Sequence, residues 1–281
     1  MDLIFFSKFL KDRDVRGLVE AAREFGIEGY DLCVRDGYPV SPDNFRQTLP
    51  GLLKEFRREK ISVGMVTGPT DLINPDHSAA EKILAGMAEN GVGLLKLGYV
   101  ILEKQDEYWK KVEAFRKSLA GWETLARKYK VKICYHTHSG TFLGGNCAAI
   151  MHLLKGFDPQ FIGAYIDPAH MRLEGEAFSF GRRMVREYLS IVALKDVAMV
   201  REQSGDEGHI KVDWVPAGEG AVEWSNVFQV LAESGFNGPL SVHAEYHAKD
   251  QREFESKLKR EVAYFRKKRD EALAALKKEK Q

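Results

Sequence analysis

Imidazole, carboxylate and ammonium groups recur at the ends of four apolar runs between about residue 131 and residue 245. The pairs are His136 with His138, Asp167 with His170, Lys195 with Asp196, and His243 with Glu245. Nitrogen and oxygen donors of this kind bind divalent cations, and they can also move protons near neutral pH. Because crowding such groups together is costly unless they bind something, the pattern predicts a functional site.

The histidine pair is the strongest of these signals. Side chains two residues apart on a strand share a face, so His136 and His138 point the same way, which packing alone seldom requires. His243 and Glu245 share a face for the same reason. Asp167 has a structural alternative, since it could cap the segment that follows it.

Basic residues at the strand ends are more ambiguous. Lys195 and Asp196 could form a buried ion pair, or one of them could serve the site. Arg35 and Lys96 follow two earlier apolar runs and are candidates for binding a carboxylate or phosphate. Lysine and arginine are also common surface residues, so the structural alternative stays open for both.

Eight short apolar runs and the amphipathic stretches between them must position these residues. The runs are residues 3–7, 30–34, 61–66, 93–98, 131–136, 161–166, 191–195 and 239–245. Helical patterns fill the gaps, one after a capping Asp14 and others over residues 49–58, 79–89, 108–129, 146–155, 180–189, 222–233 and 252–278. Near-continuous apolar strands alternating with helices predict an α/β fold, a single (β/α)8 TIM barrel.

The pattern predicts one domain over residues 1–281, with a charged helical tail from about residue 266. The tail is expected to be the solvated end of the last helix, with packing against a second subunit as the alternative. Residues 201–220 form the longest stretch without a clear pattern and are expected to be an irregular, functional or mobile loop. An open doubly wound sheet is disfavoured because no glycine-rich turn follows the first run.

Composition narrows the class of protein. The 281 residues carry 42 Lys and Arg against 41 Asp and Glu, a net charge of +1, which argues against a nucleic-acid partner. Three cysteines without a CxxC pair argue against a disulfide scaffold. No targeting segment and no apolar run of bilayer length is apparent, so the expectation is a cytoplasmic protein without a membrane partner.

Taken together, the strand-end residues resemble those of the xylose-isomerase-like TIM barrels, a family of sugar phosphate isomerases and epimerases. The resemblance runs from residue 26 to the last helix. It rests on the motifs YHTHSG (135–140), DPAHM (167–171), LKD (194–196), PAGEG (216–220) and HAEY (243–246).

The resemblance implies one divalent metal ion (Mn, Mg, Co or Zn), held by acids and a histidine from strands five to eight. Asp167 and Glu245 match two of these ligands, and His170 matches the family's substrate-binding histidine. Two positions depart from the pattern. His136 stands where strand five should bring a glutamate, and Ala193 stands where strand seven should bring a histidine.

These departures bear on the reaction. His243 could supply the missing ligand, which gives a predicted metal set of His136, Asp167, Glu245 and His243. The loss of the strand-five glutamate puts a symmetrical two-carboxylate epimerisation in doubt. The histidines of strand five are similar to the inosose dehydratase branch of the family.

The sequence therefore predicts a metal-dependent isomerase or epimerase that acts on a sugar, sugar phosphate or related polyol carbonyl compound through an enediolate. Its alternatives are a dehydratase of a keto-cyclitol or keto-sugar, and a catalytically inactive sugar-binding barrel. A homodimer is possible. The predicted catalytic residues are Glu245, His136 and His138, and the predicted substrate-binding residues are His170, Lys195, Arg35 and Lys96.

Overall fold

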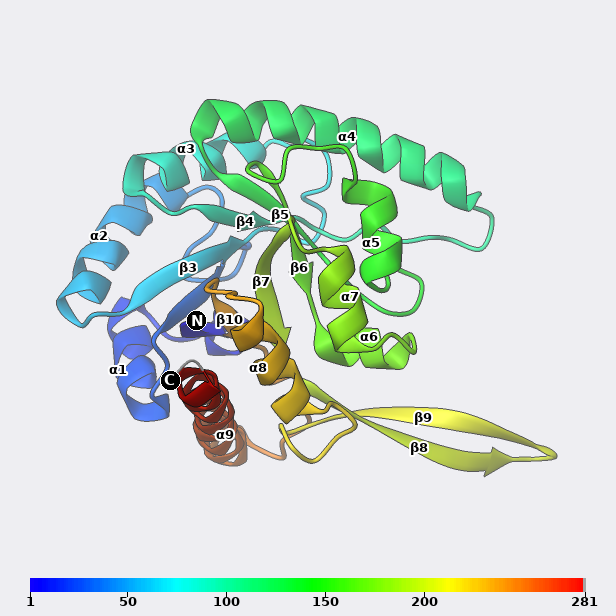
Figure 1. The fold of residues 1–281 in the computed structure, drawn as a ribbon. Coiled ribbons are helices and arrows are strands. Elements are labelled where there is room, and N and C mark those ends of the chain that lie inside the picture. The colour runs from blue at the N-terminus through cyan, green and yellow to red at the C-terminus, as the bar shows by residue number, and fades with distance from the viewer. Residues whose placement is uncertain (280–281) are drawn as a thin grey trace.

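Eight parallel strands close into a barrel in the computed structural model, which describes residues 1–279 (Figure 1). Around the barrel the order is β1, β10, β7, β6, β5, β4, β3, β2. The bounds are β1 (Leu3–Phe6), β2 (Gly29–Cys33), β3 (Ser62–Thr67), β4 (Leu94–Lys96), β5 (Lys132–His136), β6 (Ile162–Ile166), β7 (Leu189–Leu194) and β10 (Leu240–Val242). The predicted TIM barrel is confirmed.

Helices cover the outside of the barrel. They are η1 (Ser7–Leu10), α1 (Val15–Phe25), α2 (Phe45–Arg58), α3 (Ala80–Asn90), α4 (Tyr108–Tyr129), α5 (Cys147–Leu154), α6 (Pro168–Leu173), α7 (Phe178–Met184), α8 (Trp224–Glu233) and α9 (Gln251–Glu279). Asp14 caps α1 as predicted, because its carboxylate accepts the Gly17 N–H at 2.8 Å.

Two predicted helices are wrong in their bounds. The helix expected over residues 49–58 begins earlier, at Phe45. The helix expected over residues 180–189 begins earlier and ends at Met184, and β7 already begins at Leu189. The preceding short helix α6 was not expected. It begins because Asp167 caps it and Pro168, which lacks an N–H, occupies its first position.

The barrel interior is polar at the carboxyl ends of the strands and apolar further inside. Ile4, Met65, Cys134, Tyr165, Ile191 and Ala193 form a buried cluster inside it. Burial raises the pKa of the Cys134 thiol to about 12, so this cysteine is an unreactive core residue. The polar layer above this cluster is where the predicted site residues meet.

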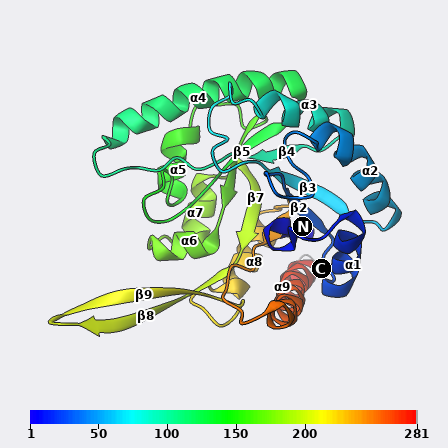
Figure 2. The same ribbon diagram turned by 180° about the vertical axis from the view of Figure 1, so that it is seen from behind.

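Residues 201–220 are not the irregular loop that the sequence predicts. Most of them belong to an antiparallel hairpin of β8 (Asp196–Ser204) and β9 (Glu207–Val215), which projects from the barrel (Figures 1 and 2). A two-residue turn at Gly205 and Asp206 joins the strands, and Gly205 has a positive φ of 59°. The hairpin places β9 residues beside the mouth of the barrel.

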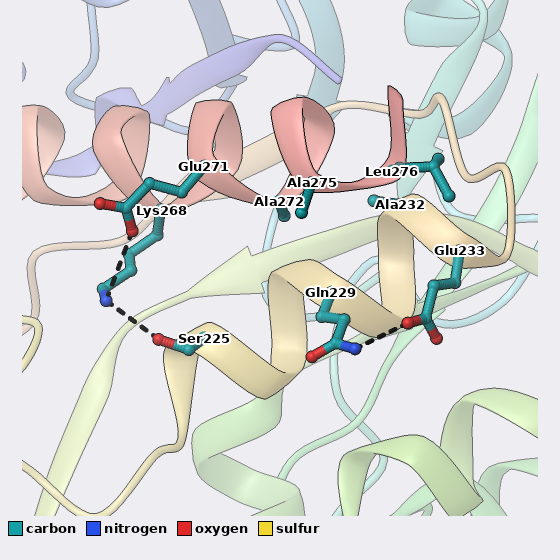
Figure 3. Close-up of a pocket in the computed structure, with 9 residues that line it drawn as sticks. All are labelled: Ser225, Gln229, Ala232, Glu233, Lys268, Glu271, Ala272, Ala275 and Leu276. Carbon is teal, nitrogen blue, oxygen red and sulfur yellow. Dashed lines mark hydrogen bonds and ion pairs between the residues drawn. The ribbon is translucent and has the colours of Figure 1, made fainter. Parts of the chain in front are cut away.

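The predicted charged tail is continuous with α9, which lies against α8. Arg269 donates to the Met1 carbonyl at 3.0 Å and pairs with Glu28 at 2.8 Å, so this part of α9 is fixed to the amino-terminal ends of the strands. Figure 3 shows a groove beside it, where Lys268 of α9 donates to Ser225 of α8 at 2.9 Å. Residues 280–281 of the predicted tail lie outside the described residues.

No helix within residues 1–279 has the length and apolar character needed to cross a bilayer. The cytoplasmic location and the possible homodimer stay predictions.

Candidate active site at the carboxyl ends of the strands

Lys195, which directly follows β7, lies at the centre of the predicted site. Its Nζ is 2.7 Å from Glu245 Oε2, 2.8 Å from His170 Nε2 and 3.4 Å from Asp167 Oδ2. The side chain is 4% exposed. Burial opposes its charge, but the two carboxylates outweigh burial and raise the pKa of Lys195, so the ammonium form persists at neutral pH.

Asp167 combines the two roles that the sequence left open. Its Oδ1 caps α6 by accepting the backbone N–H groups of Ala169 at 2.8 Å and His170 at 3.3 Å. Its Oδ2 faces the site, 3.7 Å from His136 Nε2. Burial raises the pKa of Asp167 to about 6, although Lys195 lowers it.

His136 and His138 both reach the site from the end of β5. Both ring nitrogens of His136 are buried and have no hydrogen-bond partner within residues 1–279. The ring of His138 lies against that of His170, with centroids 4.1 Å apart. Burial and neighbouring positive charges hold the pKa of His136 well below its usual value and lower that of His138 to about 4, so both are neutral at pH 7.

Glu245 lies at the open side of the cluster. Its Oε2 accepts from Lys195, and its Oε1 is 3.5 Å from Lys8 Nζ. Burial raises the pKa of Glu245, but the surrounding positive charges outweigh burial and hold it well below its usual range. Glu245 is therefore a carboxylate at every pH near neutrality.

His243 takes part in a deeper network than the sequence predicts. Its Nε2 lies 2.6 Å from the hydroxyl of Tyr165, which also lies 3.3 Å from Asp31 Oδ2. Asp31 accepts further bonds from Thr67 at 2.6 Å and Ser241 at 3.1 Å. Burial lowers the pKa of His243 to about 3, so the imidazole is a neutral member of this network.

Lys96 and Arg35 lie on another side of the same mouth. Lys96 Nζ donates to the Leu97 carbonyl at 3.3 Å and lies 4.0 Å from the centre of the Tyr99 ring. Burial and the neighbouring Arg35 lower the pKa of Lys96 to about 7. Arg35 Nε donates to the Gly68 carbonyl at 3.2 Å. This side of the mouth suits an anionic group.

Lys195 and Asp196 do not pair with each other. Asp196 accepts from the backbone N–H groups of Gly218 at 2.9 Å and Val222 at 3.1 Å, and from the indole of Trp224 at 2.9 Å. It is 1% exposed. Asp196 therefore holds the loop that follows the hairpin, while its neighbour Lys195 bonds to Glu245 and His170.

Two aromatic residues of the site were missed from the sequence. Tyr165 stands two residues before Asp167 on β6, so strand periodicity alone could have placed it on the same face. Trp214 lies on β9, with Lys195 Nζ 4.3 Å from its ring centre and His170 at a centroid distance of 5.2 Å. It was missed because its segment was not recognised as a strand.

The residues present do not fit the implied divalent ion as they are arranged. A protein metal site needs three or more donors about 2.0–2.2 Å from one point. Among the described residues no such group of His, Cys, Asp or Glu occurs. Of the four predicted ligands, His136 and Asp167 keep open donor atoms, whereas the other two already bond to Lys195 and Tyr165.

Comparison with known proteins assigns the chain to a class. Residues 19–268 match the model of the family described as "Xylose isomerase-like TIM barrel". The chain therefore belongs to this family, as its motifs predict.

Among curated relatives, the chain is similar to an inosose dehydratase of Lacticaseibacillus casei, with 27% identity over 267 residues that cover 85% of this chain and 86% of the relative. Among solved structures, the fold matches a 3-keto-D-glucoside 4-epimerase from E. coli at a TM-score of 0.73 and 12% identity, covering 95% of this chain and 99% of that one. It also matches the IolI protein, solved with a bound zinc atom, at a TM-score of 0.71 and 15% identity, covering 98% and 99%. The dehydratase and the epimerase are enzymes by name, and the two solved structures share the fold of this chain.

Proposed function

We propose that this protein is an isomerase or epimerase that moves a proton beside the carbonyl group of a small sugar, sugar phosphate or related polyol carbonyl compound. The observation that carries the proposal is the convergence of Lys195, Glu245, Asp167 and His170 at the carboxyl ends of β6, β7 and β10. This end of the barrel is where the chemistry of such folds takes place.

The proposed reaction begins when a base removes the proton from the carbon next to the carbonyl. The C–H electron pair forms the C=C bond of an enediolate, and the carbonyl π electrons move onto oxygen. A proton returned to the neighbouring carbon gives an isomer, and one returned to the other face gives an epimer. The developing oxyanion needs a positive group beside it, because the carbon acid is otherwise too weak.

Each proposed residue has one task in this scheme. Glu245 is the base, since it is a carboxylate at neutral pH and lies at the open side of the cluster. The neutral imidazole of His136 or His138 handles the second proton. His170 and Lys195 bind substrate oxygens.

The substrate class follows from the charge of the mouth. Lys96 and Arg35 lie where they could bind a carboxylate or phosphate of the substrate. The divalent ion that the sequence predicts on His136, Asp167, Glu245 and His243 is not part of this scheme, and no step here depends on it.

A dehydratase is the second candidate function, and the similarity to inosose dehydratase favours it. It would share the first proton removal. The two reactions differ after the enediolate has formed. In a dehydratase the oxyanion electrons re-form the carbonyl, the C=C bond shifts to the next carbon, and the hydroxyl group there leaves with its bonding electrons. This group takes up the proton that the base had removed, so that one water leaves the substrate.

A proton-exchange assay tests both candidates. The purified protein is incubated in D₂O with inosose, a 3-keto-D-glucoside and simple ketoses, and NMR and mass spectrometry follow the carbon next to the carbonyl. Deuterium incorporation with an isomeric product supports the isomerase or epimerase, and loss of one water supports the dehydratase. Glu245→Gln should abolish either reaction with the circular dichroism spectrum unchanged; an equally active variant excludes Glu245 as the base.

A further inference from the structure

We propose that the ammonium group of Lys195, and not a divalent ion, is the resident cation of this site and stabilises the substrate oxyanion. The inference rests on the proposed function. It departs from the metal-dependent scheme that the family resemblance implies, and it follows from how the donor atoms of this chain are arranged.

Lys195 faces acceptor atoms on three side chains. An ammonium group has three N–H donors and no acceptor; Lys195 Nζ is hydrogen-bonded to Glu245 at 2.7 Å and His170 at 2.8 Å, and it forms an ion pair with Asp167 Oδ2 at 3.4 Å. Because Lys195 can only donate, His170 Nε2 is the acceptor of this pair, while the other ring nitrogen, Nδ1, lies 2.7 Å from Ser139 Oγ and 3.2 Å from the Ser139 backbone N–H. The site is therefore built around a fixed positive charge.

The same carboxylates cannot serve a metal while this ammonium group is in place. Both acidic side chains of the predicted metal set, Asp167 and Glu245, face Lys195. An ion between them would lie next to a like charge in a buried site, where repulsion is weakly screened. Binding a metal would require Lys195 to leave its three partners.

Position 193 of β7, where the family pattern has a histidine, supplies no metal ligand in this chain. Ala193, two residues before Lys195 on β7, shares its face and is fully buried. Its methyl group packs with Tyr165 and Ile191 inside the barrel. A histidine at position 193 would have brought a ring nitrogen to this face, whereas alanine adds no donor beside Lys195.

The surroundings of Lys195 suit contact with a substrate oxyanion. The indole of Trp214 covers the ammonium group at 4.3 Å from its ring centre. Of its three acceptors, the neutral His170 is the one that a negatively charged oxygen would replace most readily, because the carboxylates bind the cation more strongly. His170 would then be free to bond to a substrate hydroxyl.

Metal titration of three purified proteins tests the inference. Mn²⁺ and Zn²⁺ are titrated by calorimetry into the wild type, Lys195→Met and the matched control Lys8→Met, which also removes a positive charge near Glu245 but from a side chain that is 39% exposed. We expect the wild type to contain no metal as purified and to bind added metal weakly. The affinity for metal should rise about tenfold or more in Lys195→Met and should change little in the control. Lys195→Gln is the second variant if the methionine variant does not fold.

Three results would overturn the inference: a stoichiometric metal ion in the wild type, loss of wild-type activity on treatment with EDTA, or Lys195 variants that bind metal no better than the wild type. The proposed function fails separately, when the wild type processes none of the carbonyl compounds. The calorimetric comparison does not depend on that outcome.

Discussion

Glu261, on α9, is a buried carboxyl group whose ionisation should govern how stability depends on pH. It is 2% exposed, and its Oε1 accepts the Ala217 N–H at 3.0 Å, while its Oε2 has no partner among the described residues. Burial raises the pKa of Glu261 from 4.5 to about 8. Between these values the folded protein keeps a proton that the unfolded chain releases.

The sign and size of the effect follow from this difference. The free energy of unfolding should fall by about 1.4 kcal/mol for each pH unit between the two pKa values, or roughly 5 kcal/mol across the window. The stabilisation is complete below pH 4.5 and is lost as the pH rises through about 8. Glu261→Gln keeps an oxygen for the Ala217 N–H but cannot ionise, so it should lack this slope.

Urea unfolding at several pH values from about 5 to 8 measures the slope for the wild type and Glu261→Gln. The variant should gain stability relative to the wild type as the pH rises. Glu271→Gln is the control, because Glu271 lies on the same helix with 52% of its side chain exposed. Parallel stability curves for the wild type and Glu261→Gln would refute the reasoning.

Two further substitutions probe the mouth and its support. Trp214→Ala removes the ring over Lys195 and should lower kcat/KM by roughly ten- to thirty-fold, the size of a desolvated cation–π contact, with unfolding free energy changed by less than about 1 kcal/mol. Steady-state kinetics on the substrate found in the exchange assay measures this, and an unchanged kcat/KM would contradict it. Asp196→Ala leaves the Trp224 indole and several backbone N–H groups of the next loop without a partner. It should lower the free energy of unfolding by about 3 kcal/mol or more, and urea unfolding that shows less than about 1 kcal/mol would exclude this role.

The barrel could be predicted from the sequence because its strands are buried on both faces and therefore read as continuous apolar runs. Their ends were harder to predict. The last strand, expected over residues 239–245, pairs only over Leu240–Val242. Ala244 adopts a positive φ of 47°, which turns the chain away from the ladder while its neighbours His243 and Glu245 still reach the site.

The site could be predicted as a set of residues but not as a network. Alternation along a strand shows that His136 and His138 share a face, and the structure brings both within reach of His170. The alternation along a strand does not show which partner a long side chain binds. Lys195 could have paired with its neighbour Asp196, and only the closed barrel shows that it reaches across to Glu245, 50 residues further along the chain.

The shape of the mouth depends on two acidic residues that do not face it. Asp196 accepts N–H groups from the loop after β9, and Glu261 accepts the Ala217 N–H of the same loop from α9. This loop follows β9 directly, so both acids fix the base of the hairpin that carries Trp214. Because Trp214 lies over Lys195, loss of the contact that either acid makes with this loop should shift the indole. Ionisation of Glu261 would then couple the stability of the barrel to the geometry around Lys195.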